Sequence, residues 1–262
     1  MPRVSIGTPD RARPGPPPAG VEGPVETCAY FDGERDPVHL HLHRLSEGTA
    51  MRLSPIGLDR LGYVWEGAVE AGGHRLERGS SFIVEQGAAL EVVAQAEAAL
   101  AVFAPGHAPE VLRDGGHVHL LPYDRVPRVP DRTGSGTTGA LHSDGRCPTC
   151  ELWLNENSLA GRPEAPSPEE ALRGTHAHPA DEIIFITEGQ VRLGHRLYDR
   201  GTALAIAAHT LYGFSPGPEG VSFITFRPTR ADTIRFAAGG DYAESTYFNG
   251  IGTIAYLEPV AG

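Results

Sequence analysis

The sequence predicts an all-β protein built from two related β-barrels. From Val38 onward, short apolar runs alternate with Gly, Pro and Asp, and no stretch keeps the periodicity of a long helix. Several landmarks also recur once along the chain at a nearly constant offset. Closely spaced short strands are typical of sandwiches and barrels, and a recurrence at a fixed offset indicates two copies of one β unit.

Three pairs of glycine-centred landmarks define this repeat. In each pair the neighbouring residues also match, as in the tetrapeptide Gly-His-Arg-Leu, which occurs in both copies. The pairs are Gly67 and Gly189, 122 residues apart; Gly73 and Gly194, 121 apart; and Gly79 and Gly201, 122 apart. Agreement within one residue over three landmarks is hard to reach by chance, so we expect a duplicated fold.

The repeat divides the chain into four predicted segments. Residues 1–35 are rich in Pro and are expected to form a loose or extended arm. The first β unit should span residues 36–110, and the second should span residues 147–262 with a C-terminal extension. Residues 111–146 are expected to hold a connecting strand followed by a flexible linker of Gly, Ser and Thr.

One short helix is expected directly before residue 176. Ser167 would be its N-cap, Pro168 its first residue, Glu170 the capping-box partner and Gly174 the residue that ends it. A lid over a pocket and a plain connector are both consistent with this position.

Composition excludes several function classes. A net charge of −11 argues against a nucleic-acid or anionic-membrane partner. No apolar run approaches membrane-spanning length, and no charged leader precedes an apolar stretch, so we expect a soluble cytoplasmic protein. All 22 basic residues are Arg, so no Lys is present for a Schiff base.

The three cysteines are too few for a disulfide framework. Cys147 and Cys150 form a CxxC, and Cys28 lies far away in sequence. A redox CxxC normally stands at the start of a helix, whereas a strand is expected here. A structural zinc site would need more ligands than Cys28 adds. We expect free, reduced thiols, with a redox or metal role for Cys147 and Cys150 left open.

The most informative group is His176, His178 and Glu182. Alternate side chains of a strand share a face, so the two imidazoles should point the same way. A short turn then returns Glu182 to the same pocket, directly before an apolar run. Two imidazoles and a carboxylate that converge in this way form a facial triad, which typically holds Fe(II) with open positions. The alternative is a pair of surface histidines beside an acidic turn.

With these residues the chain resembles the cupin superfamily, whose small jelly-roll barrels often occur duplicated as bicupins. The first cupin motif reads Gly-x5-His-x-His-x3-Glu-x6-Gly. It is matched at His176, His178, Glu182 and Gly189, whereas Glu170 stands at the opening Gly position.

The resemblance covers about residues 36–105 and 147–228. It implies two tandem cupin (jelly-roll) β-barrels, of which the C-terminal one binds a divalent metal through His176, His178 and Glu182. Fe(II) is favoured for this site, and Mn(II), Zn(II) and Ni(II) are alternatives.

The second cupin motif, Gly-x5-Pro-x-Gly-x2-His, departs from the pattern at its metal ligand. Counted from Gly201, Ala207 stands at the Pro, His209 at the Gly and Tyr212 at the metal-binding His. Either Tyr212 ligates or lies nearby, or His209 supplies the fourth ligand, or three protein ligands suffice. Tyr212 and His209 are also the candidate acid–base groups.

The first copy is expected to be a degenerate, metal-free cupin domain. Shifted by 122 residues, the triad positions hold Ser54, Ile56 and Arg60. A guanidinium at a ligand position disfavours a cation, so this copy is a scaffold or, with Arg52, an anion pocket. Nearby, the alternating His39, His41 and His43 are expected to form a polar outer strand face; chelation with His117 or His119 is the alternative.

These observations favour a cupin-type metalloprotein, namely a non-haem Fe(II)-dependent dioxygenase acting on a small polar chelating substrate. A redox-neutral metal-dependent isomerase, epimerase or lyase and a non-catalytic small-molecule-binding bicupin are the alternatives. Substrate contacts are expected from Ile184, Ile186 and Arg192. Ile183 and Phe185, on the outer face, should be covered by the other barrel or by a second subunit, so a homodimer is also expected.

Overall fold

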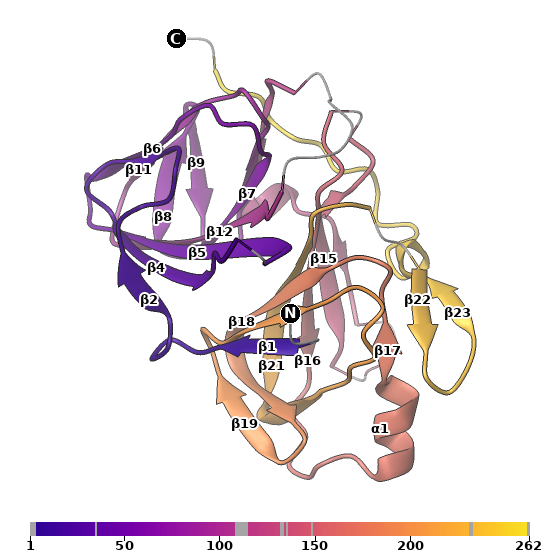
Figure 1. Cartoon of the computed structure of the whole chain (residues 1–262). Helices are drawn as coiled ribbons and strands as arrows, with labels where there is room; N and C mark the ends of the chain where they lie inside the picture. Colours follow the sequence, from indigo (N-terminus) through magenta and orange to yellow (C-terminus); the bar gives the residue numbers. More distant parts are fainter. Residues whose placement is uncertain are drawn as a thin grey trace. The chain divides into compact units, whose positions relative to one another are not determined.

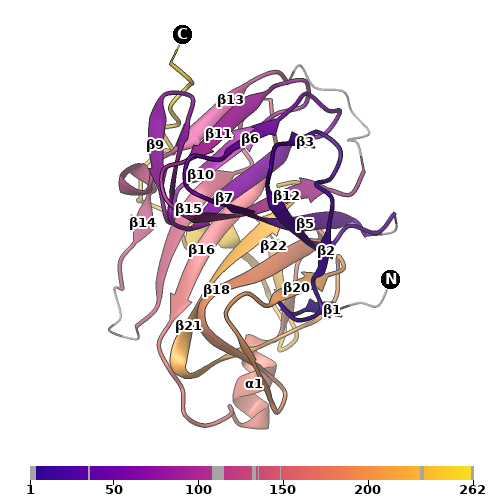
Figure 2. The same cartoon turned by 90° about the vertical axis from the view of Figure 1, so that its left-hand side faces the viewer.

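The computed structural model describes residues 4–34, 36–107, 115–131, 134, 136–147, 149–230 and 233–260. The chain forms two compact units, whose strands are drawn in Figures 1 and 2. The N-terminal barrel comprises residues 11–126, 146–152 and 254–262, and the C-terminal barrel comprises residues 1–10, 127–145 and 153–253. Both consist of antiparallel strands, which confirms the predicted all-β fold of two jelly-roll barrels.

The N-terminal barrel is built from two sheets. The strands of the larger sheet are β2 (Arg13–Gly15), β4 (Glu26–Phe31), β5 (Val38–Leu45), β7 (Arg60–Glu66), β10 (Ser81–Val84), β12 (Ala98–Pro105) and β13 (Val118–Leu121). The strands of the smaller sheet are β3 (Val21–Glu22), β6 (Ala50–Leu53), β8 (Ala68–Ala71), β9 (His74–Glu77) and β11 (Leu90–Ala94). The strand orders are β13-β10-β7-β12-β5-β4-β2 and β3-β6-β11-β8-β9. A 3₁₀ turn, η1 (Tyr123–Arg125), follows β13.

The C-terminal barrel has one large and one small sheet. The strands of the large sheet are β1 (Val4–Gly7), β14 (Arg128–Val129), β15 (Thr138–Asp144), β16 (Trp153–Leu159), β18 (Glu182–Leu193), β19 (Arg196–Asp199), β20 (Ala203–Ile206) and β21 (Ser215–Arg227). Its order is β1-β20-β18-β21-β16-β15-β14, and β19 pairs with β18. The small sheet contains β17 (His176–Ala177), β22 (Thr233–Phe236) and β23 (Asp241–Ala243), and η2 (Glu244–Thr246) follows.

The duplicated landmarks adopt the same backbone conformation in both barrels. Gly67 has φ +74° and Gly189 has φ +66°, and the other two landmark pairs also have positive φ in both members. A Cβ at Gly67 would lie 2.1 Å from the Glu97 carbonyl oxygen, and a Cβ at Gly189 would lie 2.2 Å from the Gly220 carbonyl oxygen. In both barrels the backbone at this glycine therefore lies at nearly the same short distance from another carbonyl oxygen, which explains why Gly recurs there.

Both ends of the chain are built into sheets, so the compact units differ from the four contiguous segments expected. The predicted arm contributes β1 to the C-terminal barrel, where it pairs with β20, and β2 and β3 to the N-terminal barrel. Leu257 returns to the N-terminal barrel and pairs with Leu120. The terminal segments at β1 and Leu257 therefore belong to the barrel with whose strands they pair, and not to the barrel that is nearest in sequence. The expected boundary at 110 and linker positions 132, 133 and 135 lie outside the described residues.

The helix α1 (Pro168–Gly174) begins and ends where the capping signals predict (Figure 1). Ser167 accepts a hydrogen bond from the backbone N–H of Glu170, and the Glu170 side chain accepts one from the Ser167 N–H. No residue of the helix is buried. None of the described helices is long and apolar enough to cross a membrane.

The outer face of β18 is covered within one chain. Ile183 and Phe185 are both fully buried. A second subunit is therefore not needed to cover them, and the homodimer stays a prediction.

Candidate functional site

His176 and Tyr212 lie opposite each other at the edge of the small sheet of the C-terminal barrel. Their backbones form a bridge, in which each N–H donates to the carbonyl of the other at 2.9 Å. This pairing brings the imidazole and phenol rings to 4.6 Å between centroids. The second cupin motif thus places Tyr212 in the pocket of the triad, as expected from its position.

The hydrogen bonds of His176 fix which ring nitrogen carries the proton. Its Nδ1 lies 2.9 Å from the carbonyl oxygen of Gly174, which accepts, so Nδ1 is the donor in the neutral ring. Its Nε2 therefore carries the lone pair and accepts from the Tyr212 hydroxyl at 3.1 Å. Both side chains are half-buried. Solvent can reach both rings. The hydroxyl proton of Tyr212, the acid, lies between its oxygen and Nε2 of His176, the base.

A buried arginine occupies the floor of the pocket. Arg227 ends β21, and the period-two alternation that turns Val221 and Phe223 into the barrel core turns Arg227 inward as well. Its Nε donates to Glu182 Oε2 at 3.0 Å, and its Nη2 donates to His178 Nε2 at 3.1 Å. Arg227 was not predicted from the sequence. A charged residue at an inward-facing position of an apolar strand could have indicated it.

Two carboxylates balance this guanidinium. Arg227 also donates to Glu244, which is the first residue of η2. Its guanidinium carbon lies 5.8 Å from the centre of the Trp153 ring. Burial alone would lower the pKa of Arg227, but Glu244 and Glu182 outweigh it and hold the pKa above its usual value. Burial, reinforced by the Arg227 cation, lowers the pKa of His178 to about 3. His178 is therefore a neutral acceptor and Arg227 a permanent cation.

The triad does not fit a resident divalent ion in this arrangement. Glu182 Oε2 and His178 Nε2 accept from Arg227, and both residues are almost completely buried with it, while Glu182 Oε1 and His178 Nδ1 have no hydrogen-bond partner among the described residues. A metal at the motif position would have to displace a guanidinium that is 1% exposed. The cation that His178 and Glu182 bind here is the chain's own, whereas His176 bonds to Tyr212. Metal binding by His176, His178 and Glu182 stays a prediction.

His209 lies in a turn outside this pocket. Its side chain is exposed, and its φ of +61° is the one positive value among the described non-Gly residues. The cupin motif has a Gly at this position, so the left-handed turn is kept although the residue differs. The backbone N–H of His209 donates to the carbonyl of His178 at 2.7 Å. The observed role is structural, and a ligand or acid–base role stays a prediction.

The three residues expected to contact substrate lie in two places. Ile184 and Ile186 are fully buried in the core of the C-terminal barrel, with Tyr212 packed against the same cluster. Arg192 lines a separate cavity of 390 Å³, together with Arg162, Ala165, Pro166, Glu170, Ala171, Gly174, Thr175, Gly194, His195, Gly213, Phe214, Ser215 and Pro216. Thr175 and Gly213 in its wall are the chain neighbours of His176 and Tyr212.

The counterpart site in the N-terminal barrel is closed by Arg60. This side chain is buried, and its guanidinium donates to the carbonyls of Gly20 and Ser54 at 2.9 and 2.7 Å. Arg52 is exposed. Arg60 thus joins backbone segments, as expected of a scaffold. The expected polar outer face of β5 differs from the structure, because His41 and His43 are buried.

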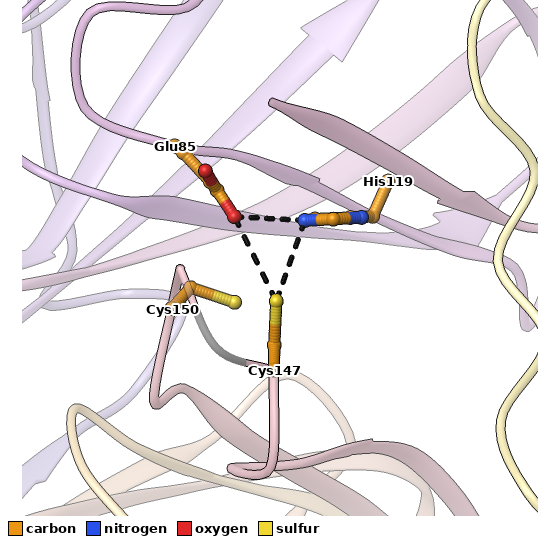
Figure 3. Close-up of side chains that lie close together, drawn as sticks. All are labelled: Glu85, His119, Cys147 and Cys150. Atoms are coloured by element: carbon orange, nitrogen blue, oxygen red, sulfur yellow. Dashed lines mark hydrogen bonds and ion pairs between the residues drawn. The ribbon is translucent and has the colours of Figure 1, made fainter. Parts of the chain in front are cut away.

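A second cluster of metal-binding side chain types lies in the N-terminal barrel. Within the described part of the chain, one group of His, Cys, Asp and Glu brings its ligand atoms within 4.8 Å of one another: Glu85, His119, Cys147 and Cys150 (Figure 3). The cysteines are free, as expected. Burial, and then the neighbouring Cys147, raise the pKa of Cys150. The sequence singled out the CxxC but not Glu85, which follows β10.

Comparison with known proteins supports the fold and no more specific identity. No family model matches the sequence, and no curated protein matches it. Solved structures do match. The protein YlbA of E. coli, family DUF861, has a TM-score of 0.60 at 15% identity, with 87% of this chain and 91% of that chain covered. The oxalate decarboxylase of Lactobacillus farciminis has a TM-score of 0.63 at 10% identity, covering 92% and 89%.

The barrels have the cupin fold. A protein of Nostoc punctiforme named as a candidate dioxygenase is similar too, with a TM-score of 0.60 at 11% identity over 88% of this chain and 84% of that chain. At such identities the likeness extends to the cupin barrels and not to an activity. The chemistry therefore has to come from the side chains of this chain.

Proposed function

We propose that this cupin-fold chain is an enzyme that transfers a proton on a small polar substrate at His176 and Tyr212, without a metal ion. The observation that carries the proposal is the engagement of His178 and Glu182 by the buried Arg227. It leaves an accessible imidazole–phenol pair above a floor in which one guanidinium offsets one of two carboxylate charges. The reaction class is redox-neutral: an isomerisation, epimerisation or elimination next to a carbonyl group.

His176 is the general base in this proposal. Its Nδ1–H is held by the Gly174 carbonyl, so its Nε2 lone pair faces the Tyr212 hydroxyl and the space beside it. When a substrate displaces the phenol, Nε2 takes a proton from the carbon next to the carbonyl. A positioned imidazole of this kind contributes about 10²- to 10⁴-fold to a proton transfer.

Tyr212 is the acid that steadies the developing enolate. Burial, followed by the Glu182 carboxylate, raises the pKa of Tyr212 well above its usual value. The phenol therefore stays protonated and donates its O–H to the oxygen on which negative charge develops. Arg227 keeps the net charge of the floor at a single negative charge, from two carboxylates and one guanidinium.

The cavity beside the pair suits a small anionic substrate. Its wall contributes the guanidinium groups of Arg162 and Arg192 and the imidazole of His195, with Phe214 as an apolar side. Arg162 is paired with Glu170, whereas Arg192 donates to two backbone carbonyls at its rim.

An Fe(II)-dependent dioxygenase is the second candidate function, and one observation supports it. His176 holds its Nδ1–H on a backbone carbonyl and turns Nε2 inward, as metal-ligating histidines do, and His178 also turns Nε2 inward. This candidate requires Arg227 to leave His178 and Glu182. The redox-neutral candidate requires no such change.

Deuterium exchange separates the two candidates. The full chain is incubated in D₂O with small 2-oxo acids and 2-hydroxy acids, and exchange next to the carbonyl is followed by NMR with and without a chelator. We expect exchange that the chelator leaves unchanged and that Tyr212→Phe and His176→Gln abolish. Chelator-sensitive oxygen uptake with added Fe(II), lost in His178→Ala, would replace this proposal with the dioxygenase.

A further inference from the structure

We infer that Glu85, His119, Cys147 and Cys150 form a structural binding site for a thiophilic divalent metal ion, with Zn(II) as the expected occupant. The site lies within the N-terminal barrel and is separate from the His176–Tyr212 pair, which is in the other unit. Two thiolates, one imidazole and one carboxylate are a donor set that Zn(II) accepts in tetrahedral geometry.

The distances agree with the edges of such a tetrahedron. With usual Zn–S and Zn–N lengths, a sulfur and a nitrogen on one zinc ion lie about 3.6 Å apart. Cys147 Sγ is 3.7 Å from His119 Nε2 and 3.8 Å from Glu85 Oε1. His119 Nε2 and Glu85 Oε1 are 2.8 Å apart, joined by a hydrogen bond that an ion would replace at about 3.3 Å. Figure 3 shows Cys150 Sγ turned toward the same point.

Backbone pairing positions the two non-sulfur ligands. His119 lies opposite Ile83 in the β10–β13 pair, and Glu85 follows β10 directly. The second oxygen of Glu85, Oε2, accepts from the backbone N–H of His117 at 3.1 Å, which turns Oε1 toward the cysteines. The ring of Tyr256 packs on His119 at 5.1 Å between centroids. Such surrounding contacts fix the direction of metal ligands in known sites.

The site is closed, as structural metal sites are. The Glu85 side chain is 0% exposed, Cys150 is fully buried, the His119 side chain is 16% exposed, and Cys147 is half-buried. Catalytic zinc sites keep a coordination position open to water or substrate. Four protein ligands with this burial leave none, so the ion would hold the fold together rather than catalyse.

Binding would join Cys147 and Cys150 to β13, through His119, and to Glu85, the residue after β10. Residues 146–152 belong to the N-terminal barrel although residues 127–145 and 153–253 on both sides of them belong to the other unit. Cys147 is 62 residues from Glu85 in sequence, so the ion closes a long loop. Both thiols lose their protons to solvent when they bind, and no electrons are transferred.

Metal analysis of the purified full chain tests the site. We expect about one equivalent of zinc per chain, reduced to near zero in Cys147→Ser/Cys150→Ser and in His119→Ala. Cys28→Ser and His117→Gln are matched controls, because they remove the remaining cysteine and the neighbouring exposed histidine, and they should keep the zinc. Glu85→Gln keeps the side chain shape and should lower the Zn(II) affinity at least ~10-fold.

A spectroscopic readout covers variants that fail to fold. Metal-free wild-type chain is titrated with Co(II), and we expect thiolate-to-metal charge-transfer bands and tetrahedral d–d bands that one equivalent of Zn(II) abolishes. A folded chain that takes up neither ion while both thiols react freely would overturn the inference. So would a Cys147–Cys150 disulfide found by mass spectrometry in that folded, metal-free chain.

Discussion

Nη2 of Arg227 lies 3.1 Å from Nε2 of His178, one of the three residues that the sequence predicted to hold a metal ion. The same guanidinium reaches Glu182 through Nε. An internal cation therefore sits where an external one was expected. An arginine side chain keeps its charge at any physiological pH, so the proposed chemistry at this pocket needs no added metal ion.

Arg227→Met should destabilise the chain by about 3–5 kcal/mol, because it leaves the buried Glu182 carboxylate without its cation. Urea unfolding measures this change. Arg162→Met is the matched control, since the Arg162–Glu170 pair is exposed and should contribute less than about 1 kcal/mol. Equal effects of the two substitutions would show that Arg227 is not essential to the pocket floor.

Tyr212→Phe should lower proton transfer by about 10²- to 10⁴-fold with little change in fold, because the ring stays and only the hydroxyl is lost. The measurement is the initial rate of deuterium exchange on an accepted substrate. Thr210→Val changes a buried hydroxyl two residues away and should leave that rate unchanged. A Tyr212→Phe rate within about 3-fold of wild type would remove the phenol from the mechanism.

The free energy of unfolding should fall as the pH is lowered below about 6.5. Burial lowers the pKa of His43 to about 3 and that of His41 to about 4. Both values lie below the 6.5 of an unperturbed histidine, so the unfolded state binds protons first. Their contribution is complete above pH 6.5 and is lost as the pH falls toward 4 and then 3. At about pH 5 the loss is roughly 2 kcal/mol for each histidine.

Urea unfolding at several pH values checks this expectation. Thr27 bonds to Nδ1 of His43, and Asp32 lies 4.0 Å from Nε2 of His41. His43→Gln should make the pH dependence shallower, whereas His107→Gln, at an exposed position, should leave it unchanged. An unchanged slope in His43→Gln would mean that other groups control acid unfolding.

Gly189→Ala and Gly67→Ala should each destabilise the chain by roughly 1–3 kcal/mol. In both cases the added Cβ would lie too close to a backbone carbonyl oxygen and the residue has positive φ. Thermal unfolding gives the comparison. Gly57→Ala is the control, because nothing lies within 4 Å of its Cβ position and its φ is not in the left-handed region. A neutral effect at Gly189 would argue against the shared turn geometry.

The sequence predicted those structural features that depend on residues close together in the chain. The capping box of α1 was predicted from Ser167 and Glu170, because a cap needs only residues three apart. The duplicated glycines predicted the two barrels, since each has a positive φ that only Gly adopts easily. Motif spacing made Tyr212 one of several candidates beside the triad, and the structure pairs its backbone with that of His176.

The site residues that the sequence did not predict reach their sites through contacts between distant parts of the chain. Arg227 and Glu244 reach the pocket from 45 or more residues beyond Glu182, through a strand and a turn with no metal motif. The CxxC was weighed with Cys28 as its third partner, whereas strand pairing supplies His119 and Glu85 instead. A motif of fixed spacing cannot reveal ligands that come from separate segments of the chain.

A Mn(II) titration of the full chain tests the central claim, that Arg227 takes the place of a metal ion in the C-terminal pocket. Mn(II) prefers oxygen and nitrogen ligands, so the cysteine site does not compete for it. Free Mn(II) is followed by its electron paramagnetic resonance signal, in wild type and His178→Ala. The account predicts that wild-type chain leaves the signal unchanged. Uptake of one Mn(II) per chain by wild type, lost in His178→Ala, would contradict it.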